Sequence, residues 1–116
     1  MNILITEHQG FTTLSPIGEL DANSSVLLDE KIEEILHKGI YNLHIECSKL
    51  TYISSAGLGV FISYLETLKT GNGKFVFSGM SEGVYKVFEL LGLPRIMSIV
   101  SHPDAVNKEF EKNGAL

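Results

Sequence analysis

The sequence of 116 residues contains a single cysteine, Cys47, which lies within an alternating apolar segment. One cysteine excludes a disulfide framework within the chain and fits a reducing compartment. No apolar run approaches the roughly 20 residues that a membrane-spanning helix needs. The first residues also lack the basic region and apolar core of a signal peptide. We therefore predict a cytoplasmic protein that does not act in a membrane.

Basic residues are also scarce, because nine lysines and arginines stand against fourteen acidic residues and give a net charge of −5. Nucleic acids and anionic membranes repel such a surface, so neither is expected as the main partner. The length is close to the commonest size of a single domain. We expect one domain over residues 1–112, followed by a frayed tail over residues 113–116.

Apolar periodicity and turn residues predict alternating strands and helices. Strands are expected over residues 1–6 and 11–17 as a hairpin, and then over 41–47, 74–78 and 96–100. Helices are expected to begin near residues 21–25, 55, 81 and 102–104. Residues 48–51 are expected to be a loop, and Pro16 is expected at a strand end or a bulge.

After the hairpin, every connection between strands is therefore expected to pass through a helix, which generates parallel pairing. The predicted fold class is α/β. It is a single domain with a mixed, mostly parallel sheet of about five strands, about four helices and an opening β-hairpin.

The segment over residues 52–61, Tyr-Ile-Ser-Ser-Ala-Gly-Leu-Gly-Val-Phe, joins the end of a loop to the start of a helix. Ser55 is the expected N-cap of that helix, because serine is strongly preferred at this position. Gly57 and Gly59 then fall in the first turn, although each glycine costs roughly 1 kcal/mol relative to alanine inside a helix. Two glycines there indicate that another element of the fold, or a partner, lies close to the backbone.

The start of a helix also has a chemical use. Its unpaired N–H groups and partial positive charge tolerate an anion. A phosphate on Ser55 would add about −1.5 to −2 charges without disrupting the helix. Serine is a common N-cap with no further role, and the helix start taken alone favours this cap-only interpretation, while the phosphate interpretation remains open.

Glycine-rich nucleotide motifs are absent from the sequence. The segment over residues 71–74, Gly-Asn-Gly-Lys, resembles the end of a phosphate loop, but Phe75 stands where that loop needs a hydroxyl. The segment over residues 57–59 does not match a dinucleotide-binding fingerprint, because Ile62 occupies the position of the third glycine. No cofactor is therefore expected on this chain.

Enzymatic chemistry is also disfavoured. Ser55 with Gly57 forms half of a nucleophile elbow, but Ile53 replaces the first glycine of that motif. The nearest candidate base, His102, stands at a helix start before Pro103. The four histidines and Cys47 lack metal-ligand spacing. We expect no enzyme, no catalytic residue and no metal site, with a small serine hydrolase using Ser55 as a remote alternative.

The chain resembles the STAS domain family, and within it the single-domain anti-sigma factor antagonists. Three segments carry this resemblance in the right order and spacing, and a final helix near Asp104 completes it. They are Gly-Glu-Leu-Asp at residues 18–21, Tyr-Ile-Ser-Ser-Ala-Gly-Leu-Gly at residues 52–59 and Val-Tyr-Lys-Val-Phe-Glu-Leu-Leu-Gly-Leu at residues 84–93.

The resemblance implies a switch controlled by phosphorylation of Ser55. In this family a serine kinase of the histidine-kinase-like ATPase fold, often itself the anti-sigma factor, phosphorylates the serine at the start of the second helix. The unphosphorylated domain binds this kinase and frees the sigma factor. Phosphorylation breaks the complex, and a metal-dependent serine phosphatase of the PPM type restores it. ATP and metal would then belong to the partners.

Two departures from the family pattern bear on the site. The family commonly has Asp-Ser-Ser-Gly or Asp-Ser-Thr-Gly, whereas here Ser54 replaces the Asp and Ala56 replaces the second hydroxyl. The loss at position 56 removes a rival acceptor and leaves Ser54 as the fallback. The loss of the carboxylate removes a group that the kinase reads or that assists transfer.

The residues expected on the partner-binding surface come from the loop before the first helix and from the start of the second. They are Asp21, Asn23, Ser54, Ala56, Gly57 and Gly59. The alternative within the same family is a constitutive STAS scaffold that is never phosphorylated and serves another signalling pathway.

Overall fold

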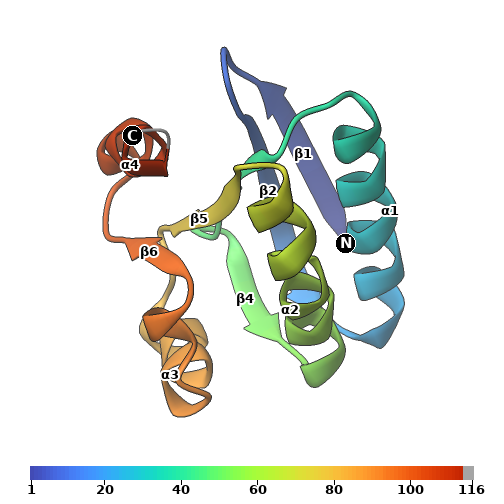
Figure 1. Ribbon diagram of the computed structural model, residues 1–116. Helices are drawn as coiled ribbons and strands as arrows, with labels where there is room; N and C mark the ends of the chain where they lie inside the picture. The colour runs from blue at the N-terminus through green and yellow to red at the C-terminus, as the bar shows by residue number, and fades with distance from the viewer. Residues whose placement is uncertain (114–116) are drawn as a thin grey trace.

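The computed structural model describes residues 1–113 as an α/β domain, with α1 and α2 packed on a sheet (Figure 1). The prediction of a frayed tail therefore falls, for residues 114–116, outside the described part of the chain. The elements, in order, are β1 (Asn2–Glu7), β2 (Thr12–Leu20), α1 (Ala22–His37), β3 (Asn42–Glu46), β4 (Leu50–Ile53), α2 (Ser55–Thr70), β5 (Lys74–Ser78), α3 (Glu82–Leu90), β6 (Ser98–Val100) and α4 (Val106–Asn113). Short 3-10 helices, Leu93–Arg95 and Pro103–Ala105, flank β6.

The sheet has the order β1-β2-β3-β5-β6, and β4 pairs with β2 outside this path. β1 runs antiparallel to β2, while β2, β3, β5 and β6 pair in parallel, as do β2 and β4. The predicted α/β class, the opening hairpin and the mixed, mostly parallel sheet are confirmed.

The strand β4 was not expected, because residues 48–51 were predicted to be a loop. Ser48 and Lys49 form a turn, but β4 begins at Leu50, so the prediction is wrong for residues 50 and 51. β3 pairs with the first part of β2, at Thr12–Leu14, and β4 pairs with its last part, at Gly18–Leu20. No helix separates β3 from β4, so the expectation of a helix in every strand connection also fails here. In four residues, two buried and two exposed positions do not establish a strand period.

Pro16 lies inside β2, opposite Ile3 of β1, rather than at a strand end. The parallel pairing of β2 changes from β3 to β4 between Leu14 and Gly18. Pro16 lies in this interval, so its missing N–H group interrupts neither the ladder with β3 nor the ladder with β4. The bulge expected at Pro16 occurs just after it, between Gly18 and Glu19, and Gly18 has a positive φ of 103°.

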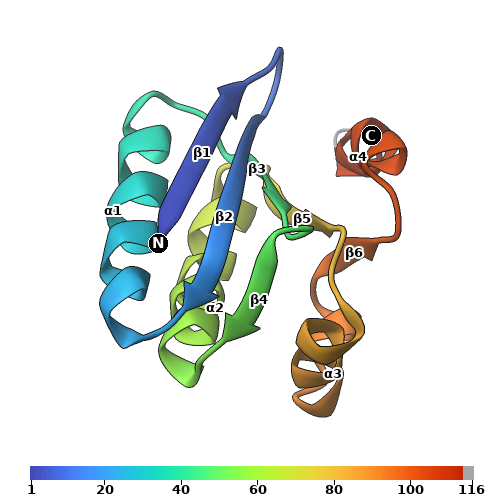
Figure 2. The same cartoon turned by 180° about the vertical axis from the view of Figure 1, so that it is seen from behind.

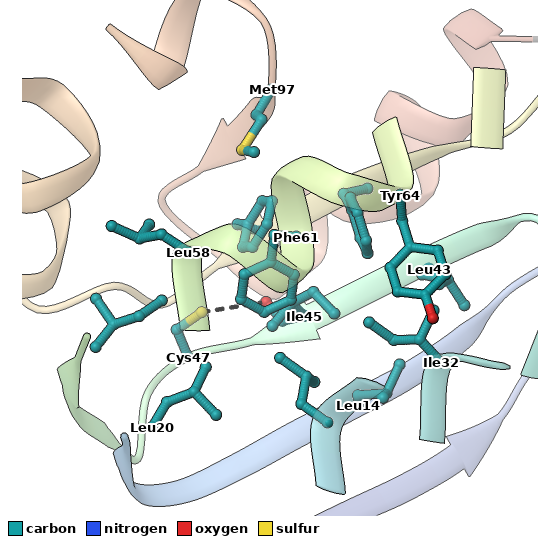
Figure 3. Packing of buried hydrophobic residues seen from close by; sticks show 14 of the residues in the cluster. Leu14, Leu20, Ile32, Leu43, Ile45, Cys47, Leu58, Phe61, Tyr64 and Met97 are labelled. Carbon is teal, nitrogen blue, oxygen red and sulfur yellow. Dashed lines mark hydrogen bonds between the residues drawn. The ribbon is translucent and has the colours of Figure 1, made fainter. Parts of the chain in front are cut away.

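The main core lies between the sheet and the two helices α1 and α2. Figure 3 shows Leu58 and Phe61 of α2 lying above Ile45 of β3. Cys47 joins this core with 1% of its surface exposed, and its thiol contacts the Ile45 carbonyl oxygen at 3.5 Å. Burial raises the pKa of Cys47 to about 12. Cys47 is thus a small core residue and not a reactive thiol, as the sequence predicted.

Among residues 1–113, no helix covers the other face of β1 and β2 (Figure 2), and α4 packs against β5 through Val106 and Phe110. A line of polar side chains crosses this face. His8 bonds Thr13 at 3.0 Å, Thr13 bonds His44 at 2.9 Å, and His44 bonds Ser78 at 2.7 Å. Both ring nitrogens of buried His44 are therefore engaged by hydroxyl groups, which accommodate a neutral imidazole.

We expect His44 to make the protein less stable in mild acid. Burial lowers the pKa of His44 below its ordinary 6.5, nearby His8 lowers it further, and Glu46 opposes them. The unfolded chain then binds the proton first, so stability is complete above pH 6.5 and falls as the pH drops toward the folded pKa. Urea unfolding between pH 5 and 8 measures this slope.

The matched variants for this measurement are His44→Gln and His37→Gln. We expect His44→Gln to flatten the dependence of the unfolding free energy on pH. His37 lies exposed at the end of α1, so His37→Gln should keep the wild-type slope. An unchanged slope in His44→Gln would show that buried His44 does not carry the effect.

Candidate functional site

The strands β2 and β4 end side by side, and each leads directly into a helix. Leu20 pairs with Ile53 at these ends, and the Ser54 N–H group donates to the Leu20 carbonyl at 2.9 Å. α1 and α2 therefore begin at the same end of the sheet, where the strands β2 and β4 finish, which is the lower end in Figure 1. Asp21 and Ser55 therefore lie at the same end of the sheet.

The N-cap of α2 is Ser54 and not Ser55, which corrects the prediction by one position. Ser54 has an extended backbone, with φ −91° and ψ 171°, and its side-chain oxygen accepts from the Gly57 N–H group at 3.2 Å. Both serines suit a cap equally well. The strand pairing of Ile53 decides between them, because it leaves Ser54 as the first residue to depart from the sheet.

Ser55 is consequently the first residue of α2, and its side chain is exposed. Ala56 follows it and is also exposed. The first-turn N–H groups and the partial positive charge of the helix end lie next to this hydroxyl. The local geometry thus combines an accessible nucleophilic oxygen with a backbone that tolerates negative charge.

The two glycines of this helix differ in their surroundings. Gly57 is buried, and a Cβ atom there would lie 2.8 Å from the Leu20 Cγ atom and 3.1 Å from the Ile53 Cγ1 atom. A Cβ atom at exposed Gly59 would meet nothing within 4 Å. Packing within the fold therefore explains Gly57. Packing does not explain Gly59, whose expected partner contact remains a prediction.

Asp21 is the N-cap of α1, within the range of residues 21–25 where this helix was expected to begin. Its carboxylate accepts from the Ser24 N–H group at 2.9 Å, and the Asp21 N–H group donates to the Ser24 hydroxyl at 2.8 Å. The bonds from Ser24 lower the pKa of Asp21, so the exposed carboxylate is ionised at neutral pH. Asn23 is exposed in the same turn. Neither position tests the predicted contact with a partner.

Sequence reasoning assigned no role to Tyr52, although the structure exposes 50% of its surface beside the site. Tyr52 pairs with Glu19 across β4 and β2, two residues before the cap Ser54. The sequence signal for Tyr52 was an aromatic residue flanked by the apolar residues Leu50 and Ile53, both of which the structure buries. That signal was missed because β4 itself was not predicted.

Three of the four histidines bond to other groups and do not supply a base to Ser55. His8 and His44 bond Thr13 and Ser78 on the opposite face of the sheet, and His37 bonds the Glu33 carbonyl. Within residues 1–113, no group of three or more His, Cys, Asp and Glu side chains is arranged to hold a metal ion. In the same part of the chain, no helix has the length and apolar character to cross a membrane.

In this α/β architecture, α1 and α2 begin at the same end of the sheet, and an exposed serine stands at the start of α2. These features agree with the family resemblance of the sequence. The family model described as the STAS domain matches residues 2–106. The chain therefore belongs to the STAS domain family.

Similar proteins support this assignment. The anti-sigma-B factor antagonist of Listeria monocytogenes serovar 1/2a is 32% identical over 97 residues, which cover 84% of this chain and 80% of that protein. The crystal structure of the Thermotoga maritima protein TM1081 superposes with a TM-score of 0.88 at 24% identity and covers 94% of both chains. The Bacillus cell fate determinant SpoIIAA in its phosphorylated form gives a TM-score of 0.73 at 19% identity, covering 92% of this chain and 98% of that one.

The two solved structures establish a shared fold, and the Listeria protein adds a relationship in sequence. Curated relatives are named as antagonists, which are regulatory proteins and not enzymes. This agrees with the prediction that the chain is not an enzyme.

Proposed function

We propose that this protein is an anti-sigma factor antagonist switched by phosphorylation of Ser55. The unphosphorylated domain binds a serine kinase that is also the anti-sigma factor, and phosphorylation by that kinase releases it. The observation that carries the proposal is that Ser55 is an exposed residue at the first position of α2. The names of the sequence relatives and the phosphorylated form of a structural relative support it.

The position of Ser55 separates the stability of the domain from its binding. A phosphate there lies at the positive end of the α2 dipole, and the cap from Ser54 to the Gly57 N–H group is left intact. The same phosphate adds a dianion beside exposed Ala56 and Gly59, two small residues against which a partner packs closely. The steric bulk and the desolvation of this charge then oppose the complex rather than the fold.

The partner surface extends to Asp21 and Asn23, which are exposed and lie at the same end of the sheet as Ser55. The ionised carboxylate of Asp21 favours a basic group on the facing surface of the kinase. ATP is bound by the kinase, which has the histidine-kinase-like ATPase fold. Metal is bound by a PPM-type serine phosphatase that removes the phosphate, and this chain holds no cofactor.

The test is to incubate the protein with the cognate kinase and ATP, and to locate the phosphorylated residue by mass spectrometry. Three proteins are compared: the wild type, Ser55→Ala and Ser54→Asp. Aspartate caps a helix as well as serine does, so Ser54→Asp keeps the cap, removes the fallback hydroxyl and restores the family's carboxylate. We expect transfer to the wild type and to Ser54→Asp, and none to Ser55→Ala.

Each other outcome has a definite meaning. Transfer that persists in Ser55→Ala and disappears in Ser54→Asp would make Ser54 the acceptor. Absence of transfer to all three proteins, with kinase binding retained, would indicate a constitutive scaffold and overturn the switch.

A further inference from the structure

The outer edge of β1 is unpaired within residues 1–113, because β1 ends the sheet order and pairs only with β2 (Figure 2). The pairing with β2 is continuous, from Asn2 opposite Ile17 to Glu7 opposite Thr12. The other side of the strand therefore presents backbone N–H and C=O groups to solvent. A row of such groups is a template for one more strand.

β1 also lacks the features that normally protect a sheet edge. Edges are protected by short strands, by lysine or proline, and by bulges. The opposite edge, β6, has three residues, whereas β1 has six and contains neither lysine nor proline. Its one charged residue, Glu7, stands at its end and pairs with Lys38 at 3.1 Å. In its middle, Leu4 is 55% exposed and Ile5 is 40% exposed.

We propose that β1 pairs with β1 of a second copy of this chain. The two strands run antiparallel about a two-fold axis at Leu4, and they join two sheets into one. The interface is separate from the Ser55 surface and does not depend on the function proposed above.

The faces of the strand select this register. Ile5 pairs with Leu14, which is fully buried beneath the helices, so Ile3 and Ile5 lie on the helix-covered face. Leu4 pairs with Ser15 and lies on the open face. Cross-strand partners share a face, and a two-fold axis perpendicular to the sheet keeps the faces matched between the copies. Each residue can therefore pair only with a residue of its own face.

Self-complementarity then favours the axis at Leu4 over its neighbour. With this axis, Leu4 lies opposite Leu4 of the second copy, Ile3 lies opposite Ile5, and Asn2 lies opposite Thr6. Apolar side chains meet apolar ones, and polar side chains meet polar ones. An axis at Ile5 would instead place Leu4 opposite Thr6 and Ile3 opposite Glu7. The strand's own sequence is therefore complementary to a second copy of itself in this register.

The first experiment reverses charge at the axis. Wild type, Leu4→Lys, Leu4→Glu and an equimolar mixture of the two variants are compared by sedimentation equilibrium over a concentration series. Like charges directly opposite destabilise a strand pair. Each variant alone should therefore raise the dimer dissociation constant by about tenfold or more, a change of about 1.4 kcal/mol. The mixture should restore association, because opposite charges then meet at the axis.

Two controls separate this interface from other effects. Leu90→Lys changes an apolar side chain at the end of α3, where 75% of its surface is exposed. It should leave the dissociation constant unchanged. Ser55→Asp should also leave it unchanged, so failure of the dimer and failure of the phosphorylation switch remain distinguishable. Circular dichroism establishes that each variant is folded.

The second experiment tests the register by disulfide cross-linking. Leu4→Cys should form a covalent dimer on mild oxidation, because residues directly opposite have Cβ atoms about 5 Å apart. Asn2→Cys and Thr6→Cys should each cross-link poorly alone and efficiently when mixed. Native Cys47 does not interfere, since it is buried with its pKa raised to about 12.

A wild-type protein that stays monomeric up to about 1 mM, the range of very weak association, would overturn the proposal. A dimer that ignores both charges at position 4 would overturn it as well. Cross-linking of Leu90→Cys as fast as Leu4→Cys would show random collision and have the same consequence.

Discussion

Ser55→Asp is expected to abolish binding to the partner kinase while leaving the domain folded and at least as stable as the wild type. An uncompensated charge buried in an interface costs several kcal/mol, and each 1.4 kcal/mol is a factor of ten. The dissociation constant should therefore rise by about a hundredfold or more. In the isolated domain, the same carboxylate at the start of α2 should stabilise by about 0.3–1 kcal/mol.

Two further variants make this result specific. Ser55→Ala should bind the kinase within about threefold of the wild type, since truncation of most interface residues is nearly neutral. Ser63→Asp places the same charge further along α2, at an exposed serine that bonds the Val60 carbonyl at 2.7 Å. It should leave binding unchanged. Isothermal titration calorimetry gives the affinities, and urea unfolding gives the stabilities.

Equal loss of binding in Ser55→Asp and Ser63→Asp would mean that overall charge, and not the helix start, controls the complex. Retained binding in Ser55→Asp would contradict the idea that charge at Ser55 releases the partner.

Gly57→Ala and Gly59→Ala should change stability in opposite directions, although they add the same methyl group to the same helix turn. At Gly57 the added carbon would lie 2.8 Å from the Cγ atom of Leu20, which is fully buried, so the neighbouring side chain must shift. Overpacking of this kind costs about 1–3 kcal/mol. At Gly59 the added carbon meets open space, and the gain in helix propensity should stabilise the domain by about 0.5–1 kcal/mol.

The measurement is the unfolding free energy of each variant in urea, with kinase affinity as a second readout. Leu20 and Ile53 immediately precede Asp21 and Ser54, so their displacement in Gly57→Ala should also weaken binding. Gly59→Ala should weaken kinase binding if the kinase packs against Gly59, and should leave binding unchanged if it does not. Equal stabilities of the two variants would contradict the packing described for Gly57.

Local patterns in the sequence predicted most of the elements. The capping residues Asp21 and Ser81 begin helices where expected, because each cap is a bond between neighbours in the chain. The turn at His8-Gln9-Gly10 joins β1 to β2 for the same reason. The helical spacing of the apolar residues in α2 also indicated that Leu58, Phe61 and Leu68 are buried, whereas Ile62, which follows the same spacing, is 43% exposed.

The errors fall where a distant part of the chain makes the decision. β4 exists because Leu50 and Ile53 find partners in β2, some thirty residues earlier, and four residues carry too short a pattern to reveal this. The N-cap of α2 is Ser54 because its N–H group is held by Leu20. Two adjacent serines with equal capping preference contain no local information that distinguishes them.

The sequence by itself determined the family, the α/β class, the acidic surface and Ser55 as the candidate acceptor, because these depend on composition, short periodicities and contiguous motifs. The tertiary structure decided which serine caps α2, why Gly57 has no side chain, and that β1 keeps an open edge. Those features depend on atoms brought together from β2, β4 and α2, or on the strand order of the sheet, and only the folded chain contains those contacts.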